Sequence, residues 1–381
     1  MISAPGCQPE EIALAAPPVA SVAMSDAGTN PFLDAANGQV STHTPVWFMR
    51  QAGRSLPEYK GVRGEGSILH AIKRPDVATE ITLQPIRRYG VDAAVLYSDI
   101  VVPPHAVGFG IDVAPGTGPV AEVPFRQRSD LDRLRPLEVD DVAYVVDTVK
   151  LLVDELPSNV PLLAFAGAPF TVGSYLIEGR PSKDYRHTKA MLHNDATLFH
   201  DVMDRLATSA ITFIDAQLTA GAGAFQLFDS WAGSLTLADY RQHVLPHSRR
   251  VFAELRAKHP TAPCVHFGIG CDHLLGSMYE AMPTDGPRIL GLDWRTPIAD
   301  ARARFGDDLV VQGNLDPALV LAGEAAALAG TAEVLRSNLR DDGTRHPAHI
   351  FNLGHGVNPD TDPGVLQAVV DTVHDATRRP D

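Results

Sequence analysis

Arg50 and Arg54 are the residues of this sequence whose type and spacing are best suited to binding an anion. They are the first positive charges of the chain, and they directly follow the short apolar run at 46–49. A guanidinium group stays charged and presents a planar fork of donors that matches a carboxylate. Gly53 lets the loop turn both arginines toward one point. The pair predicts a ligand with several carboxylates or phosphates; structural salt bridges to Asp or Glu are the alternative.

Asp99 is the carboxylate with the most distinctive position. It follows the apolar run at 93–97 after a single serine, Ser98. A carboxylate at the end of an interior strand lies in a medium of low dielectric constant and needs a partner. That partner is either Arg50 or Arg54, or it is a donor or positive charge on a ligand.

Three further side chains at strand ends are candidates for binding. His355 stands between two glycines, so its imidazole can approach a substrate closely, although a lone histidine is more often structural. Tyr175 belongs either to the core or to the site, where it would offer its hydroxyl. Ser230 is either a site residue or the cap of the following helix.

These residues all follow short apolar runs that alternate with helical patterns. Eight runs are interpreted as strands: 46–49, 93–97, 162–166, 224–228, 264–267, 289–292, 309–312 and 350–353. The helix expected at 76–89 begins after Pro75 and stops at Gly90. Continuously apolar strands that alternate with helices predict an α/β fold of one domain, a (β/α)8 TIM barrel over residues 30–381. A doubly wound open sheet is the alternative, but the glycine-rich nucleotide motifs are absent from the sequence.

Composition excludes several partners. Lys and Arg total 32 against 46 Asp and Glu, a formal net charge of −14, which argues against nucleic acid and anionic membranes. Three cysteines are too few for a disulfide framework, so a cytoplasmic location is expected. Residues 1–29 contain no Lys or Arg and include Pro17 and Pro18, which predicts a disordered tail rather than a secretory signal. No run approaches the length of a membrane span.

Other chemistries find little support in the motifs. Ser230 lacks the Gly-x-Ser-x-Gly turn of serine hydrolases. Cys264 and His266 offer two metal ligands without an evident third. His243 and His247 have helical spacing without the glutamate of a zinc protease, and they are interpreted as part of a solvated helix face. No metal site is predicted.

Two stretches resemble the uroporphyrinogen decarboxylase family. The first is Pro-Val-Trp-Phe-Met-Arg-Gln-Ala-Gly-Arg at 45–54, and the second is Gly-Ala-Pro-Phe-Thr-Val-Gly-Ser-Tyr at 167–175. Shorter matches at 97–99, 228–233 and 352–356 follow in the same order, so the resemblance extends from about residue 30 to the C-terminus.

The resemblance implies a (β/α)8 barrel that removes the four acetate carboxyl groups of uroporphyrinogen, giving coproporphyrinogen and CO2 in haem biosynthesis, without metal or organic cofactor. It implies a homodimer. It assigns catalysis to Asp99, Arg50 and Arg54. The substrate-binding residues that it implies are Arg50, Gln51, Ala52, Gly53, Arg54, Asp99, Tyr175, Ser230 and His355.

Two alternatives belong to other classes. A related barrel family transfers methyl groups from corrinoid proteins to thiols with zinc held by His and Cys. It would require His-x-Cys at the fifth strand, where His266 is instead followed by Phe267 and Gly268. A non-enzymatic tetrapyrrole carrier is the second alternative.

The segment at 101–140 is interpreted as a rim or lid over the mouth of the barrel. Its apolar side chains are expected to lie exposed, as a dimer interface or a lid would require. These side chains are Val102, Pro103, Pro104, Val107 and Phe109.

Overall fold

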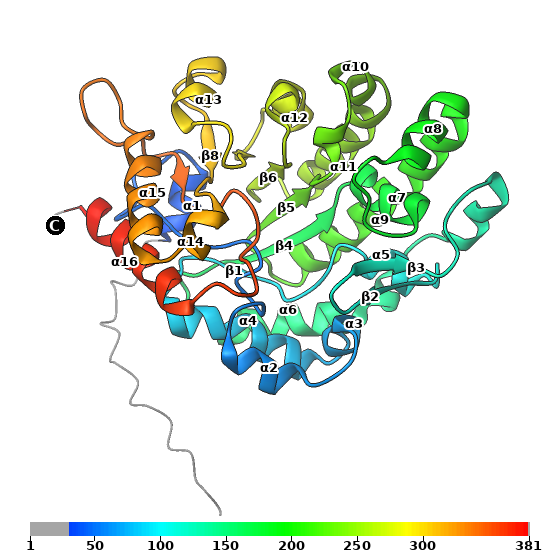
Figure 1. The fold of residues 1–381 in the computed structure, drawn as a ribbon, viewed down its shortest axis with the longest axis horizontal. Coiled ribbons are helices and arrows are strands. Elements are labelled where there is room, and N and C mark those ends of the chain that lie inside the picture. The colour runs from blue at the N-terminus through cyan, green and yellow to red at the C-terminus, as the bar shows by residue number, and fades with distance from the viewer. Residues whose placement is uncertain (1–29, 380–381) are drawn as a thin grey trace, which may run out of the picture.

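A curled, parallel sheet of seven strands lies at the centre of the molecule (Figure 1). The structure is a computed structural model that describes residues 30–379, so the tail expected at 1–29 lies outside the described residues. Neighbouring strands follow chain order, and almost all their residues are buried, as expected for parallel strands covered on both faces. The strands are β1 (Ala94–Val95), β4 (Leu162–Gly167), β5 (Ala224–Phe228), β6 (Cys264–Phe267), β7 (Arg288–Gly291), β8 (Val310–Gln312) and β9 (His349–Ile350).

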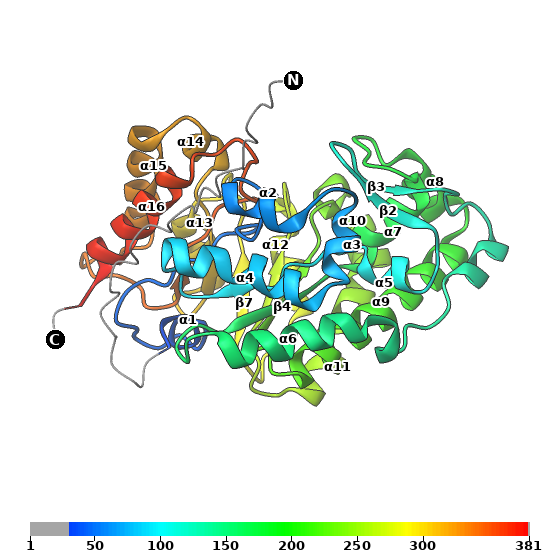
Figure 2. The ribbon, with the colours of Figure 1, turned by 90° about the horizontal axis from the view of Figure 1, so that it is seen from below.

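Helices surround the outside of the sheet, and α4, α6 and α9 pack against β1, β4 and β5 (Figures 1 and 2). The helix expected at 76–89 is confirmed as α4, which ends where Gly90 adopts a φ of 61°. The helices are α1 (Pro31–Ala36), α2 (Pro57–Arg63), α3 (Ile68–Ile72), α4 (Pro75–Tyr89), α5 (Val102–Ala106), α6 (Ala143–Glu155), α7 (Pro169–Glu178), α8 (Arg186–Asn194), α9 (Ala196–Thr219), α10 (Leu237–Asp239), α11 (Leu245–Lys258), α12 (Leu275–Ala281), α13 (Ile298–Phe305), α14 (Pro317–Leu321), α15 (Glu324–Arg336) and α16 (Pro363–Thr377). None of these helices combines the length and apolar character that a membrane span requires.

The run at 46–49 does not form the regular strand that the sequence predicts. Only Val46 pairs, through a parallel bridge to Phe351 beyond β9. The Trp47 N–H still donates to the Phe351 carbonyl at 3.2 Å, but the two amides after it bond to side chains. Phe48 N–H donates to the Gln51 Oε1 at 2.9 Å, and Met49 N–H donates to the Asn352 Oδ1 at 3.0 Å. Side chains therefore replace a strand ladder at this edge of the sheet.

Polar side chains meet inside the curl of the sheet. The indole N–H of Trp47 donates to Gln312 Oε1 at 3.1 Å, and Gln312 Nε2 donates to Gln226 Oε1 at 2.9 Å. Gln226 and Gln312 come from β5 and β8, and all three side chains are buried. These bonds connect the run at 46–49 to distant strands across the interior.

The segment at 101–140 packs closely on the molecule. It contains α5 and the antiparallel hairpin β2 (Ile111–Ala114) and β3 (Gly118–Ala121), which lies beside α7 in both views (Figures 1 and 2). The Ala121 N–H donates to the Gly179 carbonyl at the end of α7 at 2.9 Å.

The expected exposure of this segment's apolar side chains is wrong. Phe109 is 2% exposed, and the guanidinium of Arg133 covers its ring at 4.1 Å. The segment buries the five side chains expected at the surface within its own chain, because α5 packs against α9 and the hairpin. The residues expected to be exposed that are instead buried are Val102, Pro103, Pro104, Val107 and Phe109.

Candidate active site

The loop after the run at 46–49 has an unusual backbone. Arg50, Gly53 and Arg54 have φ angles of 63°, 89° and 51°, in the left-handed region that non-glycine residues rarely adopt. A Cβ atom on Gly53 would lie 3.1 Å from the ring of Tyr59, so glycine is needed here for space as well as for conformation. Strained residues persist where the surroundings hold them, and they often mark functional sites.

We call residues 50–54 the arginine loop, and the side chain of Gln51 holds this loop on the core. Its buried side chain accepts the Phe48 N–H and donates to the Ala93 carbonyl at 2.9 Å. Its backbone N–H also donates to Phe48 O. Gln51 is therefore engaged in shaping the loop, while Ala52 is half-buried against the core.

Arg50 extends over the loop that follows β9. A Cβ atom on Gly356 would lie 2.6 Å from its Cδ, so the glycine provides the room that this side chain occupies. Arg50 takes part in none of the ion pairs formed among residues 30–379. The salt-bridge alternative is therefore wrong for Arg50.

Asp99 is half-buried and likewise forms no ion pair with another described residue. Its Oδ1 accepts the Val101 N–H at 3.0 Å. Burial raises the pKa of Asp99, and this N–H and the charge of Arg50 only partly oppose the rise. The Asp99 carboxylate therefore lies near the charge of Arg50 but does not form an ion pair with it.

Tyr175 lies in the same electrostatic neighbourhood. Burial raises the pKa of its hydroxyl, the charge of Asp99 adds to the rise, and that of Arg50 opposes it. Its ring packs on Trp231 with centroids 3.8 Å apart, and Tyr185 meets the same indole at 5.0 Å. The sequence does not predict the aromatic wall formed by Trp231 and Tyr185, because the two residues are remote from each other in sequence and the match at 228–233 gives Trp231 no role.

His355 is held as a neutral imidazole near Arg50. Burial is the main cause that lowers the pKa of His355, and the positive charge of Arg50 lowers it further. Its Nδ1 accepts the Gly356 N–H at 2.6 Å, which leaves Nε2 as the nitrogen that carries the proton. The imidazole can therefore act as a donor through Nε2.

Ser230 does not cap a helix, so that alternative is wrong. The short 3-10 turn at Ala232–Ser234 begins after Trp231 and has no side-chain cap. Ser230 is half-buried at the end of β5.

Asp229, next to Ser230, is completely buried. Its Oδ1 accepts the hydroxyl of Thr171 at 2.9 Å, and that hydroxyl in turn accepts the Trp231 N–H at 3.2 Å. Its Oδ2 has no hydrogen-bond partner among the described residues. Burial raises the pKa of Asp229 to about 7, with the Thr171 bond opposing. This acid supports the backbone that carries Trp231.

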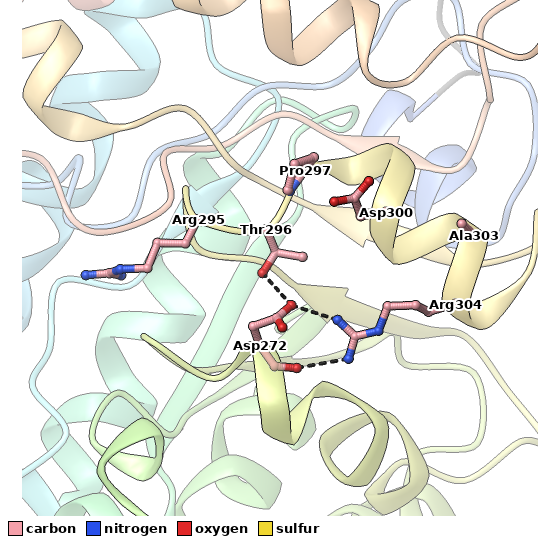
Figure 3. A pocket seen from close by; sticks show the side chains of 7 residues that line it. All are labelled: Asp272, Arg295, Thr296, Pro297, Asp300, Ala303 and Arg304. Atoms are coloured by element: carbon pink, nitrogen blue, oxygen red, sulfur yellow. Dashed lines mark hydrogen bonds and ion pairs between the residues drawn. The ribbon is translucent and has the colours of Figure 1, made fainter.

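A separate hollow of about 450 Å³ lies beyond β7, between the Asp272 turn and α13 (Figure 3). Arg304 spans it, donating to the Asp272 carboxylate at 2.7 Å and to its carbonyl at 2.9 Å. The hollow contains none of the predicted site residues, and two of its charged side chains, Arg304 and Asp272, pair with each other. It is not the site that the sequence indicates.

Comparison with known proteins connects this geometry to a family. The family described as Uroporphyrinogen decarboxylase (URO-D) matches residues 28–376. A uroporphyrinogen decarboxylase of Salinispora tropica is 50% identical over 355 residues, covering 93% of this chain and 92% of the relative. One of Streptomyces coelicolor is 51% identical over 348 residues, covering 91% and 95%.

A solved methyltransferase from Methanosarcina mazei is similar in fold, with a TM-score of 0.74 and 16% identity over 91% of this chain and 98% of its own. At that identity the likeness concerns the fold alone, and it supports the expected α/β architecture with a curled parallel sheet. The relatives at about half identity do not favour the methyltransferase alternative. The chain belongs to the uroporphyrinogen decarboxylase family.

Proposed function

We propose that the chain removes the four acetate carboxyl groups of uroporphyrinogen III, giving coproporphyrinogen III and CO2 in porphyrin biosynthesis. The observation that carries the proposal is Asp99, a half-buried carboxylate without an ion-pair partner among the described residues, set close to Arg50. Such a group suits a ligand that brings its own N–H donors and its own carboxylates, as a porphyrinogen does. Family membership supports the same reading.

In this proposal the pyrrole ring is the electron sink. Protonation of the ring carbon next to the one that bears the acetate produces a cation that extends to the acetate-bearing carbon. Cleavage of the bond to the carboxylate sends its electron pair into this cation, releases CO2 and leaves an exocyclic methylene group. A second proton adds to the methylene to give the methyl group, and the ring carbon then releases the first proton, so that one proton is taken up for each CO2. Asp99 would accept hydrogen bonds from the pyrrole N–H groups and stabilise the transient cation. This stabilisation is strongest where no other positive charge is paired with the carboxylate.

Arg50 and Arg54 would bind substrate carboxylates. The left-handed backbone at both residues supports this role, because it directs the two side chains from one short loop. Gln51, Ala52 and Gly53 would act by fixing that loop. Tyr175, Ser230 and the Nε2–H of His355 would complete the site as neutral donors, and no metal or organic cofactor is required for the chemistry.

The proposal extends to the architecture. The bridge from Val46 to Phe351 and the bond from the Asp92 N–H to the Val46 carbonyl at 2.8 Å support a closed (β/α)8 barrel, in which residues 46–49 serve as the eighth strand. Residues 30–381 would form one catalytic domain, working as a homodimer in the cytoplasm. Cys264 and Cys271 are unpaired, which suits a reducing compartment.

Anaerobic incubation with uroporphyrinogen III tests the proposal. Products separated by carboxyl number should appear in sequence and end at coproporphyrinogen. Bound but unchanged substrate would instead identify a tetrapyrrole carrier, and the decarboxylase proposal would fail.

A further inference from the structure

Two histidines and an aspartate converge far from the arginine loop. Asp92 precedes β1, His43 precedes the run at 46–49, and His374 lies near the end of α16. They therefore gather at the end of the sheet where strands begin, whereas the candidate active site lies where strands end. The decarboxylation proposed above makes no use of these residues.

The three side chains point their ligand atoms at one another. His43 Nε2 lies 2.8 Å from Asp92 Oδ1, and His374 Nε2 lies 2.8 Å from Asp92 Oδ2. Among residues 30–379 this is the one set of three His, Cys, Asp or Glu side chains whose ligand atoms all lie within 4.8 Å of one another. Ligand atoms around a tetrahedral zinc ion lie roughly 3.3 Å apart, so a small opening of the cluster would accommodate one.

The surroundings hold these ligands in place. The Val46 N–H donates to Asp92 Oδ2 at 2.7 Å, which fixes the carboxylate, and the Thr42 hydroxyl lies 3.0 Å from His43 Nδ1. A partner at the second imidazole nitrogen is typical of histidines that bind metals. The side chains of His43 and His374 are 21% and 18% exposed, so an ion and its remaining water ligands can reach them.

We propose that His43, Asp92 and His374 form a binding site for a divalent transition-metal ion of the zinc class. His43 Nε2, His374 Nε2 and the Asp92 carboxylate are the protein ligands, and water completes the coordination. On binding, the proton of His43 moves from Nε2 to Nδ1, where the Thr42 hydroxyl accepts it instead of donating. The Nε2 proton of His374 moves to its Nδ1 in the same way.

The role of this ion is structural. It would link the segment at 42–46, the residues before β1 and α16. The first and the last of these already meet where the Thr44 N–H donates to Thr377 Oγ1 at 2.9 Å. A metal that binds the folded chain alone stabilises it by mass action.

A second histidine group does not offer the same geometry. His243 and His247 are 6% and 8% exposed, so the solvated face expected for them is wrong. His200 lies between them, with Nδ1 2.9 Å from His247 Nε2 and Nε2 3.1 Å from His243 Nδ1. Because His200 uses opposite ring nitrogens, the three residues do not direct three ligand atoms at one point.

Zinc titration of the chelator-treated full-length protein, followed by its melting temperature, tests the site. With zinc at 100 times its dissociation constant, the wild-type midpoint should rise by about 4 °C or more. His43→Gln and His374→Gln should abolish the rise. His259→Gln is the matched control, because His259 also bonds to an aspartate, Asp215, at 2.8 Å but without a second histidine. His200→Gln should retain the rise as well.

Direct observation of the ion keeps the proposal testable if a variant fails to fold. Crystals of the wild-type protein soaked in zinc should give an anomalous diffraction peak between His43 and His374. Absence of that peak, no thermal shift in the wild-type protein, or a shift that disappears only in His200→Gln would overturn the proposal. The cluster would then be a hydrogen-bonded tie with no metal.

Discussion

At the scale of single residues, Asp99 and Asp229 are two acids whose pKa values are raised by burial, a rise that different neighbours oppose. Burial raises the pKa of both, but Asp99 has Arg50 and the Val101 N–H to favour its charge. Asp229 has only the hydroxyl of Thr171. The first is therefore suited to meeting a cation, and the second to remaining neutral beneath the site.

Replacing Asp99 by Asn should lower turnover about 100- to 1000-fold, because the shape is kept while the charge that stabilises the pyrrole cation is lost. Product analysis of the folded variant measures the effect. Asp362→Asn is the control, since Asp362 is exposed and caps α16, a task that Asn also performs. Near wild-type turnover in the Asp99 variant would remove Asp99 from the mechanism.

Asp229 should make stability depend on pH. Its folded pKa of about 7 lies above the value of about 3.9 in an unfolded chain. The folded state therefore holds the proton more tightly, so this contribution is complete below about pH 4 and is lost as pH rises toward 7. The wild-type protein should therefore lose about 2–3 kcal/mol of unfolding free energy between pH 5 and pH 8 that the Asp229→Asn variant does not lose.

Urea unfolding at the two pH values measures this loss. Asp195→Asn serves as the control because Asp195 is an exposed cap of α9. Parallel pH dependences of the wild-type protein and the Asp229 variant would show that Asp229 is ionised in the folded protein.

At the scale of elements, the site depends on the contact between the arginine loop and the loop after β9. The two are joined where the Val357 N–H donates to the Met49 carbonyl at 2.9 Å, and the stem of Arg50 lies against Gly356. Neither loop positions Arg50 alone.

Gly356→Ala should therefore displace Arg50 and lower kcat/KM about 10- to 100-fold, since an error of 1 Å at a reacting group has effects of this size. Stability should change little, because the clash is with a flexible side chain. Gly276→Ala is the control: its Cβ would meet only Phe305 at 3.8 Å, an ordinary contact. Steady-state kinetics separates the two, and equal activity of both variants would contradict the steric argument.

The sequence predicts the central strands of the sheet well and the segment at 46–49, at the edge of the sheet, less well. The runs at 162–166, 224–228 and 264–267 become β4, β5 and β6 because apolar residues buried on both faces leave few alternatives. The run at 46–49 has the same pattern, yet two of its amides bond to the side chains of Gln51 and Asn352, and periodicity does not encode such side-chain partners.

The same limit applies to the site. Four site residues are predicted from their places after strands and from the resemblance: Arg50, Asp99, Tyr175 and His355. The fold brings them into one neighbourhood, in which the charge of Arg50 affects the pKa of the other three. The packing of Trp231 on Tyr175 depends on how two separate loops meet, which no local pattern specifies.

At the scale of the whole molecule, the proposed catalysis and the proposed metal site are independent. Exhaustive chelation should leave the rate of decarboxylation unchanged while it lowers the melting temperature, because the cluster of His43, Asp92 and His374 lies at the opposite end of the sheet. Parallel assays of activity and thermal unfolding on one chelated sample measure both. Loss of activity that zinc restores would instead assign the ion to catalysis.

The proposed homodimer is a second property of the whole molecule. Phe109 is buried, so it is not a useful probe of the interface. Sedimentation at micromolar concentration should give twice the mass of the 40.9 kDa chain. A monomer with full specific activity would refute the dimer.

The parallel bridge between Val46 and Phe351 has a consequence for how the protein is made. The Phe351 N–H donates to the Pro45 carbonyl at 2.8 Å, so residues near the beginning of the chain find their neighbour only near its end. At roughly 5–20 residues per second, a ribosome needs about 15–60 s to synthesise the stretch between them. Throughout that interval the side of the run at 46–49 that will face Phe351 has no strand beside it, and an unpaired apolar edge is prone to association with other chains. The nascent protein is therefore most vulnerable to aggregation until its last strand leaves the ribosome, and a chaperone that shields the first 50 residues would protect it for that period.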